Sequence, residues 1–245
     1  MNPQHFILAS GNITIGQHHG VVRVFGLTIY LDVVWTTLIA AAIVLGLGLR
    51  MRAKATSGVP GKLQLFWETV VEQVSDLAES AIGPEGLPFV GLGVTIGLFI
   101  LVCNWIAFIP SGDPGYLAPP TGDVNLPLAL ALIVFFTVHY NSVKTRGLKG
   151  YFKHYAQPYA ALTPINIIEE ITKPITLTFR LFGNIFSGVL MIAVIVTLIP
   201  PFASWIGLLV WKPFDELFIG AIQAFIFALL TIMYLGQGMA EDAHA

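Results

Sequence analysis

Long, uninterrupted apolar runs dominate the chain, and each is long enough to cross a membrane as a helix. Three runs, each close to the roughly 20 residues that a crossing needs, cover 30–49, 88–109 and 124–143, and two longer ones cover 161–199 and 205–238. Their apolar positions do not alternate, so the pattern predicts helices and not barrel strands. The sequence therefore predicts an all-α integral membrane protein with about five apolar helical segments.

The last two apolar segments are too long to cross a membrane upright. A helix of about 35 residues is over 50 Å long, whereas the hydrocarbon core of a bilayer is roughly 30 Å thick. Both segments must tilt strongly or kink, and Pro174 could kink the first of them. Because Pro200-Pro201 separates them, we expect an antiparallel hairpin that follows the surface of a neighbouring protein.

Residues 62–81 form a segment of another kind, in which apolar residues recur at helical spacing and polar residues occupy the other side. This pattern predicts an amphipathic helix that lies along the membrane surface or against a partner. Its polar face is acidic, which argues against attraction to anionic lipid and favours a protein partner. In the next segment, Gly93 and Gly97 could admit a neighbouring helix, although chance also accounts for such a pair in a glycine-rich chain.

Composition agrees with membrane insertion and excludes several kinds of site. The chain is 56% hydrophobic and only 11% charged, whereas a soluble domain carries about 25% charged residues. Its single cysteine, Cys103, excludes an intramolecular disulfide and any multi-cysteine metal site. No phosphate loop, nucleophile elbow or zinc spacing occurs, and His139 and His154 have no partner at ligand spacing. We therefore expect no metal, no cofactor and no nucleic-acid partner.

The basic residues predict the orientation in the membrane. Eight of the 12 Lys and Arg residues fall in two loops, which lie on one side if the first three segments each cross once: Arg50, Arg52, Lys54, Lys62, Lys144, Arg146, Lys149 and Lys153. Basic loops mark the cytoplasmic side. The N-terminus is then outside, with residues 1–28 as an external tail that does not resemble a cleavable signal peptide. The turn at Pro200-Pro201 is also outside, and the C-terminus is inside.

One charge interrupts the first long segment. From Ile175 to Ile199, Arg180 is the only charged side chain. An arginine stays cationic, and a charge at the bilayer centre costs from about 3 to well above 10 kcal/mol, so such residues usually mark a path for an ion or substrate. The alternative is an arginine that reaches back to the membrane surface, which suits a helix end better than a position followed by about 20 apolar residues.

Small and polar residues share the helix face of this arginine. Thr176, Gly183, Asn184 and Ser187 lie at i−4, i+3, i+4 and i+7 from Arg180, and these offsets fall on one side of a helix. Small residues permit close approach of a neighbouring helix, and ordinary packing within a membrane bundle is the alternative explanation for the stripe.

The last segment carries a second polar face. Glu216, Gly220, Gln223 and Phe227 follow the spacing i, i+4, i+7, i+11, so they share one face of a helix. In an antiparallel hairpin, Gln223 can approach Arg180 near the middle of the membrane.

Carboxylates approach the central arginine from opposite sides. Glu216 lies nearer the outer side, and Glu169 and Glu170 lie nearer the inner side, before Pro174. Two aqueous half-paths interrupted by a fixed positive charge would need such an arrangement. Solvation of these carboxylates at the level of the lipid headgroups is the alternative, and the pattern does not choose between Glu169 and Glu170.

Several motifs resemble subunit a of the rotary F-type ATP synthase. They are Lys173-Pro174, Arg180-Leu-Phe-Gly-Asn184, Gly188 and the run Gly-Ala-Ile-Gln223-Ala-Phe-Ile-Phe-Ala-Leu-Leu-Thr231, and the resemblance covers essentially the whole chain. The Gly-Gln-His-His start, the Val-Pro-Gly-Lys-Leu-Gln-Leu-Phe stretch and the acidic, His-containing tail resemble the actinobacterial branch.

The resemblance implies a non-catalytic, proton-conducting stator subunit in the bacterial plasma membrane. Its partners would be a ring of c subunits, peripheral-stalk b-type subunits, the lipid bilayer and protons. Arg180 matches the essential arginine that faces the ring carboxylates, favours their ionised form and separates an outer from an inner half-channel. Asn184 and Gln223 match polar positions beside it.

Two family positions differ in this chain. Many bacterial members have a glutamate nine residues after the arginine and a histidine seven residues before the glutamine, where this chain has Val189 and Glu216. The outer carboxylate is therefore expected on the last helix alone, at Glu216. Sodium coupling is an alternative within the family. A redox membrane subunit holding a cofactor is an alternative from another class, and the placement of the histidines argues against it.

Overall fold

The computed structural model describes residues 20–24, 27–56, 58–109, 119–155 and 160–240. Most of the expected external tail, most of the loop after 109 and the acidic end of the chain lie outside the described residues. The described residues contain five helices that are long and apolar enough to cross a membrane, which confirms the all-α membrane class.

The elements follow one another along the chain from a short hairpin to a long helical pair. Their bounds are β1 Val21–Val24, β2 Leu27–Tyr30, α1 Leu31–Lys54, α2 Lys62–Ile82, the 3₁₀ helix η1 Pro84–Phe89, α3 Val90–Ile106, the 3₁₀ helix η2 Pro120–Gly122, α4 Asn125–Tyr155, the 3₁₀ helix η3 Ala160–Leu162, α5 Thr163–Leu198, α6 Pro201–Pro213, the π-helix η4 Phe214–Ile219 and α7 Gly220–Ala240.

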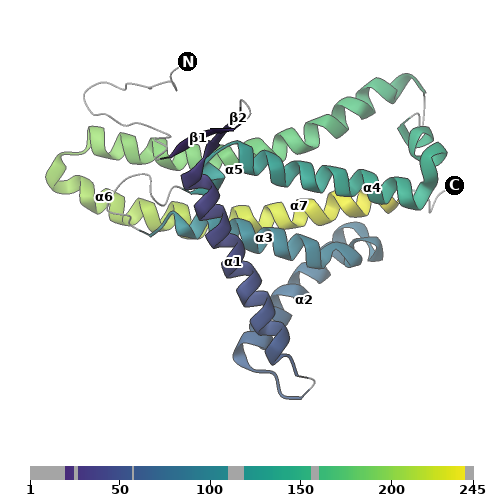
Figure 1. Ribbon diagram of the computed structural model, residues 1–245, viewed down its shortest axis with the longest axis horizontal. Helices are drawn as coiled ribbons and strands as arrows, with labels where there is room; N and C mark the ends of the chain where they lie inside the picture. Colours follow the sequence, from purple (N-terminus) through teal and green to yellow (C-terminus); the bar gives the residue numbers. More distant parts are fainter. Residues whose placement is uncertain (1–19, 25–26, 57, 110–118, 156–159, 241–245) are drawn as a thin grey trace.

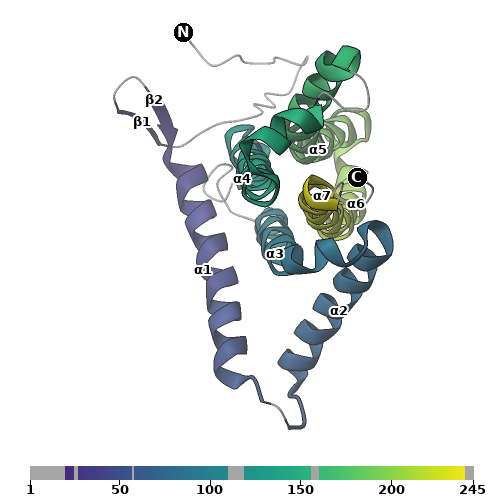
Figure 2. The same ribbon diagram turned by 90° about the vertical axis from the view of Figure 1, so that its right-hand side faces the viewer.

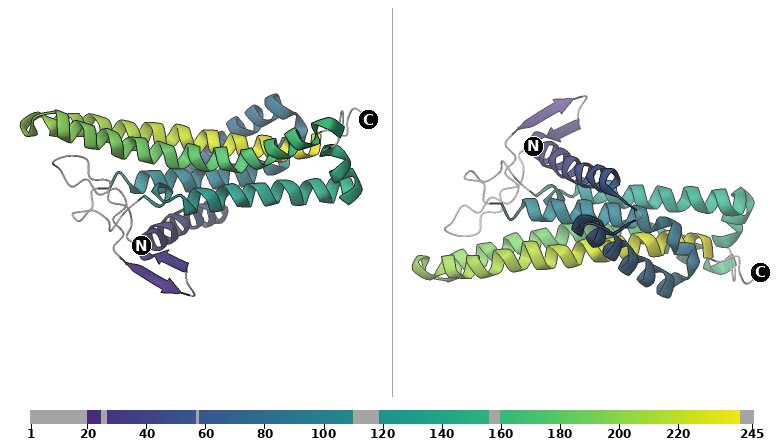
Figure 3. Two further views of the ribbon diagram at one scale, coloured as in Figure 1. Left: turned by 90° about the horizontal axis from the view of Figure 1, so that it is seen from above. Right: turned by 90° about the horizontal axis from the view of Figure 1, so that it is seen from below.

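The expected hairpin of two long helices is the main body of the molecule. In Figures 1 and 3, α5 runs antiparallel to α6 and α7, and α3 and α4 run alongside them. The helix α1 crosses these helices at a steep angle, and α1 and α2 diverge like the arms of a V (Figure 2). The two arms of the hairpin are supported by different helices, because α5 packs mainly on α4 and α7 mainly on α3.

Small residues bring α3 and α7 together. A Cβ atom on Gly97 would lie 2.8 Å from Ala228 Cβ and 3.1 Å from the Ala224 carbonyl oxygen, and one on Gly93 would lie 3.0 Å from the Ala228 carbonyl oxygen. The pair of glycines therefore does admit a neighbouring helix, and that helix is α7. This contact fixes the arm that carries Gln223.

The support of α5 by α4 is apolar. Leu177 and Leu181, which are 1% and 0% exposed, pack in one buried cluster with Ala131 and Val134 of α4. The backbone of α5 stays helical through Pro174. The buried side of α5 is therefore apolar, and its polar stripe lies elsewhere.

The amphipathic helix α2 covers the far end of α7. Val74 and Ala78 are its buried residues, and they pack with Val90, Val94 and Ile232. Its acidic side chains remain exposed. Part of the apolar face that we expected to contact a membrane or a partner therefore contacts this chain.

Three parts of the chain differ from the expectation. The span α4 consists of two helices joined at Gly147, whose φ of 69° is not helical. Together they extend beyond 143 through the basic residues to Tyr155, where we expected a loop, because Lys and Arg favour helices. We expected residues 1–28 to form an external tail, whereas residues 21–30 include the antiparallel pair β1–β2. The last long segment is interrupted by the π-helix η4, which the apolar pattern did not indicate.

Candidate functional site

Arg180 lies on an exposed side of α5. Thr176 and Ser187 are exposed on the same stripe, and a Cβ atom on Gly183 would meet nothing within 4 Å. Within the described part of the chain, no carboxylate forms an ion pair with Arg180. The positive charge therefore has no neutralising partner among the described residues and is free to meet one from outside.

The polar side chains next to Arg180 differ in their hydrogen bonding. The Ser187 hydroxyl donates to the Asn184 carbonyl oxygen at 2.8 Å, so it is already satisfied within α5. The Asn184 side chain is partly buried, and no hydrogen bond joins its amide to another described residue. Of the two, Asn184 is thus better placed to interact with a group that approaches Arg180.

Gln223 occupies the arm opposite Arg180, but no hydrogen bond joins the two among the described residues. Its side chain is 7% exposed, and its Nε2 atom has no partner within the described chain. The expected approach at mid-membrane is therefore not a hydrogen bond; α5 and α7 touch, but α5 packs mainly on α4 and α7 mainly on α3. A buried amide without a partner is costly unless another polar group reaches it.

A second carboxylate, which the sequence reasoning missed, lies beside the expected outer one. Asp215 is 8% exposed, and a Cβ atom on Gly188 of α5 would collide with its Oδ2 atom. The absence of a side chain at Gly188 thus makes room for the carboxylate. Pro213, two residues earlier, was a signal that the helix is irregular here, because proline removes one bond from the α-helical ladder.

Glu216 lies beside Asp215 and near a lysine. Its Oε1 atom is 4.0 Å from Lys212 Nζ, its side chain is 12% exposed, and its Oε2 atom is buried without a hydrogen-bond partner among the described residues. The face assigned to Glu216 and Gly220 assumed an uninterrupted α-helix. That count was wrong, because the π-helix adds one residue, and the Gly220 N–H reaches back five residues to the Asp215 carbonyl oxygen.

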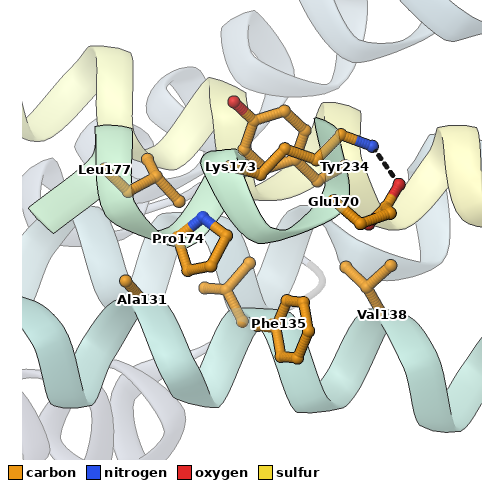
Figure 4. A pocket seen from close by; sticks show the side chains of 9 residues that line it. Ala131, Phe135, Val138, Glu170, Lys173, Pro174, Leu177 and Tyr234 are labelled. Atoms are coloured by element: carbon orange, nitrogen blue, oxygen red, sulfur yellow. Dashed lines mark hydrogen bonds and ion pairs between the residues drawn. The ribbon is translucent and has the colours of Figure 1, made fainter. Parts of the chain in front are cut away.

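The two inner glutamates are in different environments. Glu170 forms an ion pair with Lys173, whose Nζ lies 5.5 Å from the centre of the Tyr234 ring on α7. Figure 4 shows this pair at the edge of a pocket between α4, α5 and α7, lined also by Pro174 and Leu177. Glu169, by contrast, is exposed. The structure thus separates two residues that the sequence left equivalent.

Arg180 lies between the two sets of carboxylates along α5. At 1.5 Å per residue, Glu170 is about 15 Å towards the start of the helix, and Gly188, which contacts Asp215, is about 12 Å towards its end. No carboxylate is therefore level with the arginine on this helix. Among the described residues, no cluster of three or more His, Cys, Asp or Glu could hold a metal ion.

Comparisons with known proteins identify the family of this chain. The family model described as ATP synthase A chain matches residues 33–236. The chain is similar to ATP synthase subunit a of Acidothermus cellulolyticus, with 48% identity over 95% of this chain and 85% of that protein. It is also similar to ATP synthase subunit a of Mycobacterium marinum, with 46% identity, and of Mycobacterium leprae, with 45% identity; each match covers 97% of this chain and 98% of the relative. The chain therefore belongs to the family of ATP synthase subunit a.

Proposed function

We propose that this chain is the proton-translocating stator subunit of the ATP synthase membrane sector, with Arg180 facing the carboxylates of a c-subunit ring. Its family makes it a multi-pass membrane subunit of the F0 complex. The observation that carries the proposal is the exposed, unpaired arginine near the middle of α5, with carboxylates on either side of it and none at its level. A fixed cation there would favour an ionised ring carboxylate and block direct proton flow between two half-paths.

The outer half-path is assigned to Asp215 and Glu216 together. Both are largely enclosed, and Glu216 has an oxygen without a hydrogen-bond partner among the described residues, which leaves its lone pairs available to accept a proton. In the orientation predicted from the basic residues, the turn between α5 and α6 faces outwards, the N-terminus is outside and the C-terminus is cytoplasmic. Peripheral-stalk b-type subunits are the proposed partners for the exposed side of α1 and α2.

The inner half-path is assigned to Glu169, with Glu170 in a supporting position. Glu169 is exposed, whereas Lys173 holds Glu170 in an ion pair. Glu169→Gln is therefore expected to slow proton release more than Glu170→Gln in complexes of equal assembly. An equal loss in both variants, or a larger loss in Glu170→Gln, would contradict this assignment.

The decisive experiment removes the arginine from the intact complex. Arg180→Ala should abolish ATP synthesis driven by a proton gradient in vesicles, whereas Arg52→Ala, which removes an exposed arginine at the end of α1, should leave it intact. Retained coupled synthesis in Arg180→Ala would refute the proposal. Synthesis by the unmodified complex that requires sodium and persists with a proton uncoupler would assign sodium as the coupling ion.

The outer carboxylates are tested separately. Glu216→Gln and Asp215→Asn should each slow proton entry, and the double variant should slow it further than either, because each removes one proton acceptor from an enclosed site. Unchanged proton flux in all three variants, at matched assembly, would remove this pair from the path.

A further inference from the structure

The π-helix η4 determines where the two outer carboxylates point. Gly220 donates its N–H to the Asp215 carbonyl oxygen, so this turn contains one residue more than an α-helical turn. One extra residue rotates the preceding part of the helix by about 100° relative to the part that follows. Without this turn, Asp215 could not face Gly188 while Gln223 kept its buried position on α7.

A side chain from α3 is bonded to the end of this turn. Asn104 is 0% exposed, and its Nδ2 atom donates to the Gly220 carbonyl oxygen at 3.2 Å. Its Oδ1 atom accepts a hydrogen bond of 2.9 Å from the hydroxyl of Thr121, which is also 0% exposed. Both the nitrogen and the oxygen of the Asn104 amide are therefore hydrogen-bonded, and the bond from Thr121 to the oxygen keeps the nitrogen towards Gly220.

The contact depends on the glycine at the junction. A Cβ atom on Gly220 would lie 3.0 Å from Asn104 Cβ, so a larger residue would push the amide away from the carbonyl oxygen. Pro213 has no N–H to donate, so one bond of the α-helical ladder is missing just before η4. The proline does not decide where the α-helix resumes, and the bond from Asn104 marks that point at Gly220.

We propose that Asn104, oriented by Thr121, is a positioning residue that fixes the junction of η4 and α7 and thereby directs Asp215 and Glu216 into the outer proton path. This role rests on the proposed function. The alternative is a polar contact that only stabilises the packing of α3 on α7. The two roles differ in their dependence on outer pH, because only a misdirected proton acceptor becomes limiting when protons are scarce outside.

The charges around Glu216 stay the same in the variants that test this role, so they do not alter the dependence on outer pH. The charged groups acting on Glu216 are Lys212 and Asp215, and all three belong to the same helical arm. The contact from α5 comes from Gly188, and those from α3 come from Asn104 and from Trp105, whose Nε1 atom donates to the Leu217 carbonyl oxygen at 3.5 Å; all three residues are uncharged. Replacing Asn104 or Thr121 by apolar residues therefore changes no charge near the outer carboxylates.

The test measures ATP synthesis by the intact complex in vesicles while only the outer pH is varied. Asn104→Leu and Thr121→Val should lower the rate about tenfold in alkaline outer buffer but by less than about twofold in acidic outer buffer. Gly220→Ala should give the same pattern, because it displaces the same amide. Thr121→Ser keeps a hydroxyl for Asn104 and should restore the profile of the unmodified complex.

A loss by the same factor at every outer pH, or an unchanged profile in Asn104→Leu and Thr121→Val, would overturn the inference. Rates are divided by the amount of this chain in the purified complex, and if Asn104→Leu does not assemble, the comparison of Thr121→Val with Thr121→Ser decides. Arg180→Ala is measured in parallel. Coupled synthesis in Arg180→Ala refutes the proposed function, whereas its loss together with an unchanged Asn104→Leu profile refutes only the role of Asn104.

Discussion

The close packing of α3 on α7 predicts that one added methyl group will destabilise the subunit. In Gly97→Ala the new Cβ atom would lie 2.8 Å from Ala228 Cβ and 3.1 Å from the Ala224 carbonyl oxygen, both closer than ordinary van der Waals contact. The two helices must separate, and overpacking of this kind costs about 1–3 kcal/mol. For a chain of this length, 2 kcal/mol corresponds to a lowering of about 4–8 °C in the transition temperature.

The assay is the retention of this chain in the intact complex after heating, over a range of temperatures. Gly91→Ala is the matched control, because it lies on the same helix and its Cβ atom would meet nothing within 4 Å. It should leave the transition unchanged or raise it slightly. A double variant, Gly97→Ala with Ala228→Gly, removes the nearest clash and should recover about 1 kcal/mol of the loss. Equal transitions for Gly97→Ala and Gly91→Ala would refute the close approach of the helices.

Three further predictions concern other parts of the fold. A maleimide should label Cys103, which is 0% exposed, only after the complex is unfolded in detergent, and labelling of the native complex would contradict its burial. Lys173→Met should cost about 1 kcal/mol in the same heating assay, because it breaks a partly exposed ion pair with Glu170, and no change would show that the pair adds nothing to stability. Ala78→Lys places an unpaired charge in a buried contact and should cost about 3 kcal/mol or more and expose α2 to protease, whereas Glu79→Lys on its exposed side should do neither.

Periodicity and length predicted the elements whose form depends on local sequence. The amphipathic helix α2 extends over Lys62–Ile82, close to the expected 62–81, because its apolar positions recur every three or four residues. The long hairpin also followed from the apolar length of two segments and from Pro200-Pro201 between them. The exposed position of Arg180 is understandable in the same way, since it lies on the polar stripe of its helix, and the buried Leu177 and Leu181 lie to one side of that stripe.

The parts that could not be predicted depend on contacts between distant residues. The π-helix is bonded to Asn104, which is 116 residues away from Gly220 in the sequence, and no local pattern contains that bond. The burial of Asp215 depends on η4 and on Gly188. Similarly, only the packing on α7 distinguishes the pair Gly93 and Gly97 from a chance occurrence. Sequence periodicity describes one helix at a time, and these features belong to pairs of helices.

The separate support of the two hairpin arms has a mechanical consequence. A sideways force on Arg180 is transmitted first through Leu177 and Leu181 into α4, whereas a force on Gln223 passes into α3 through the contacts at Gly97. The two loads meet below the hairpin, because α4 also packs on α7, and Leu181 of one arm shares a buried cluster with Phe227 of the other. The stiffness of this subunit under a turning load would then be set by α3 and α4, which contain neither Arg180 nor Gln223.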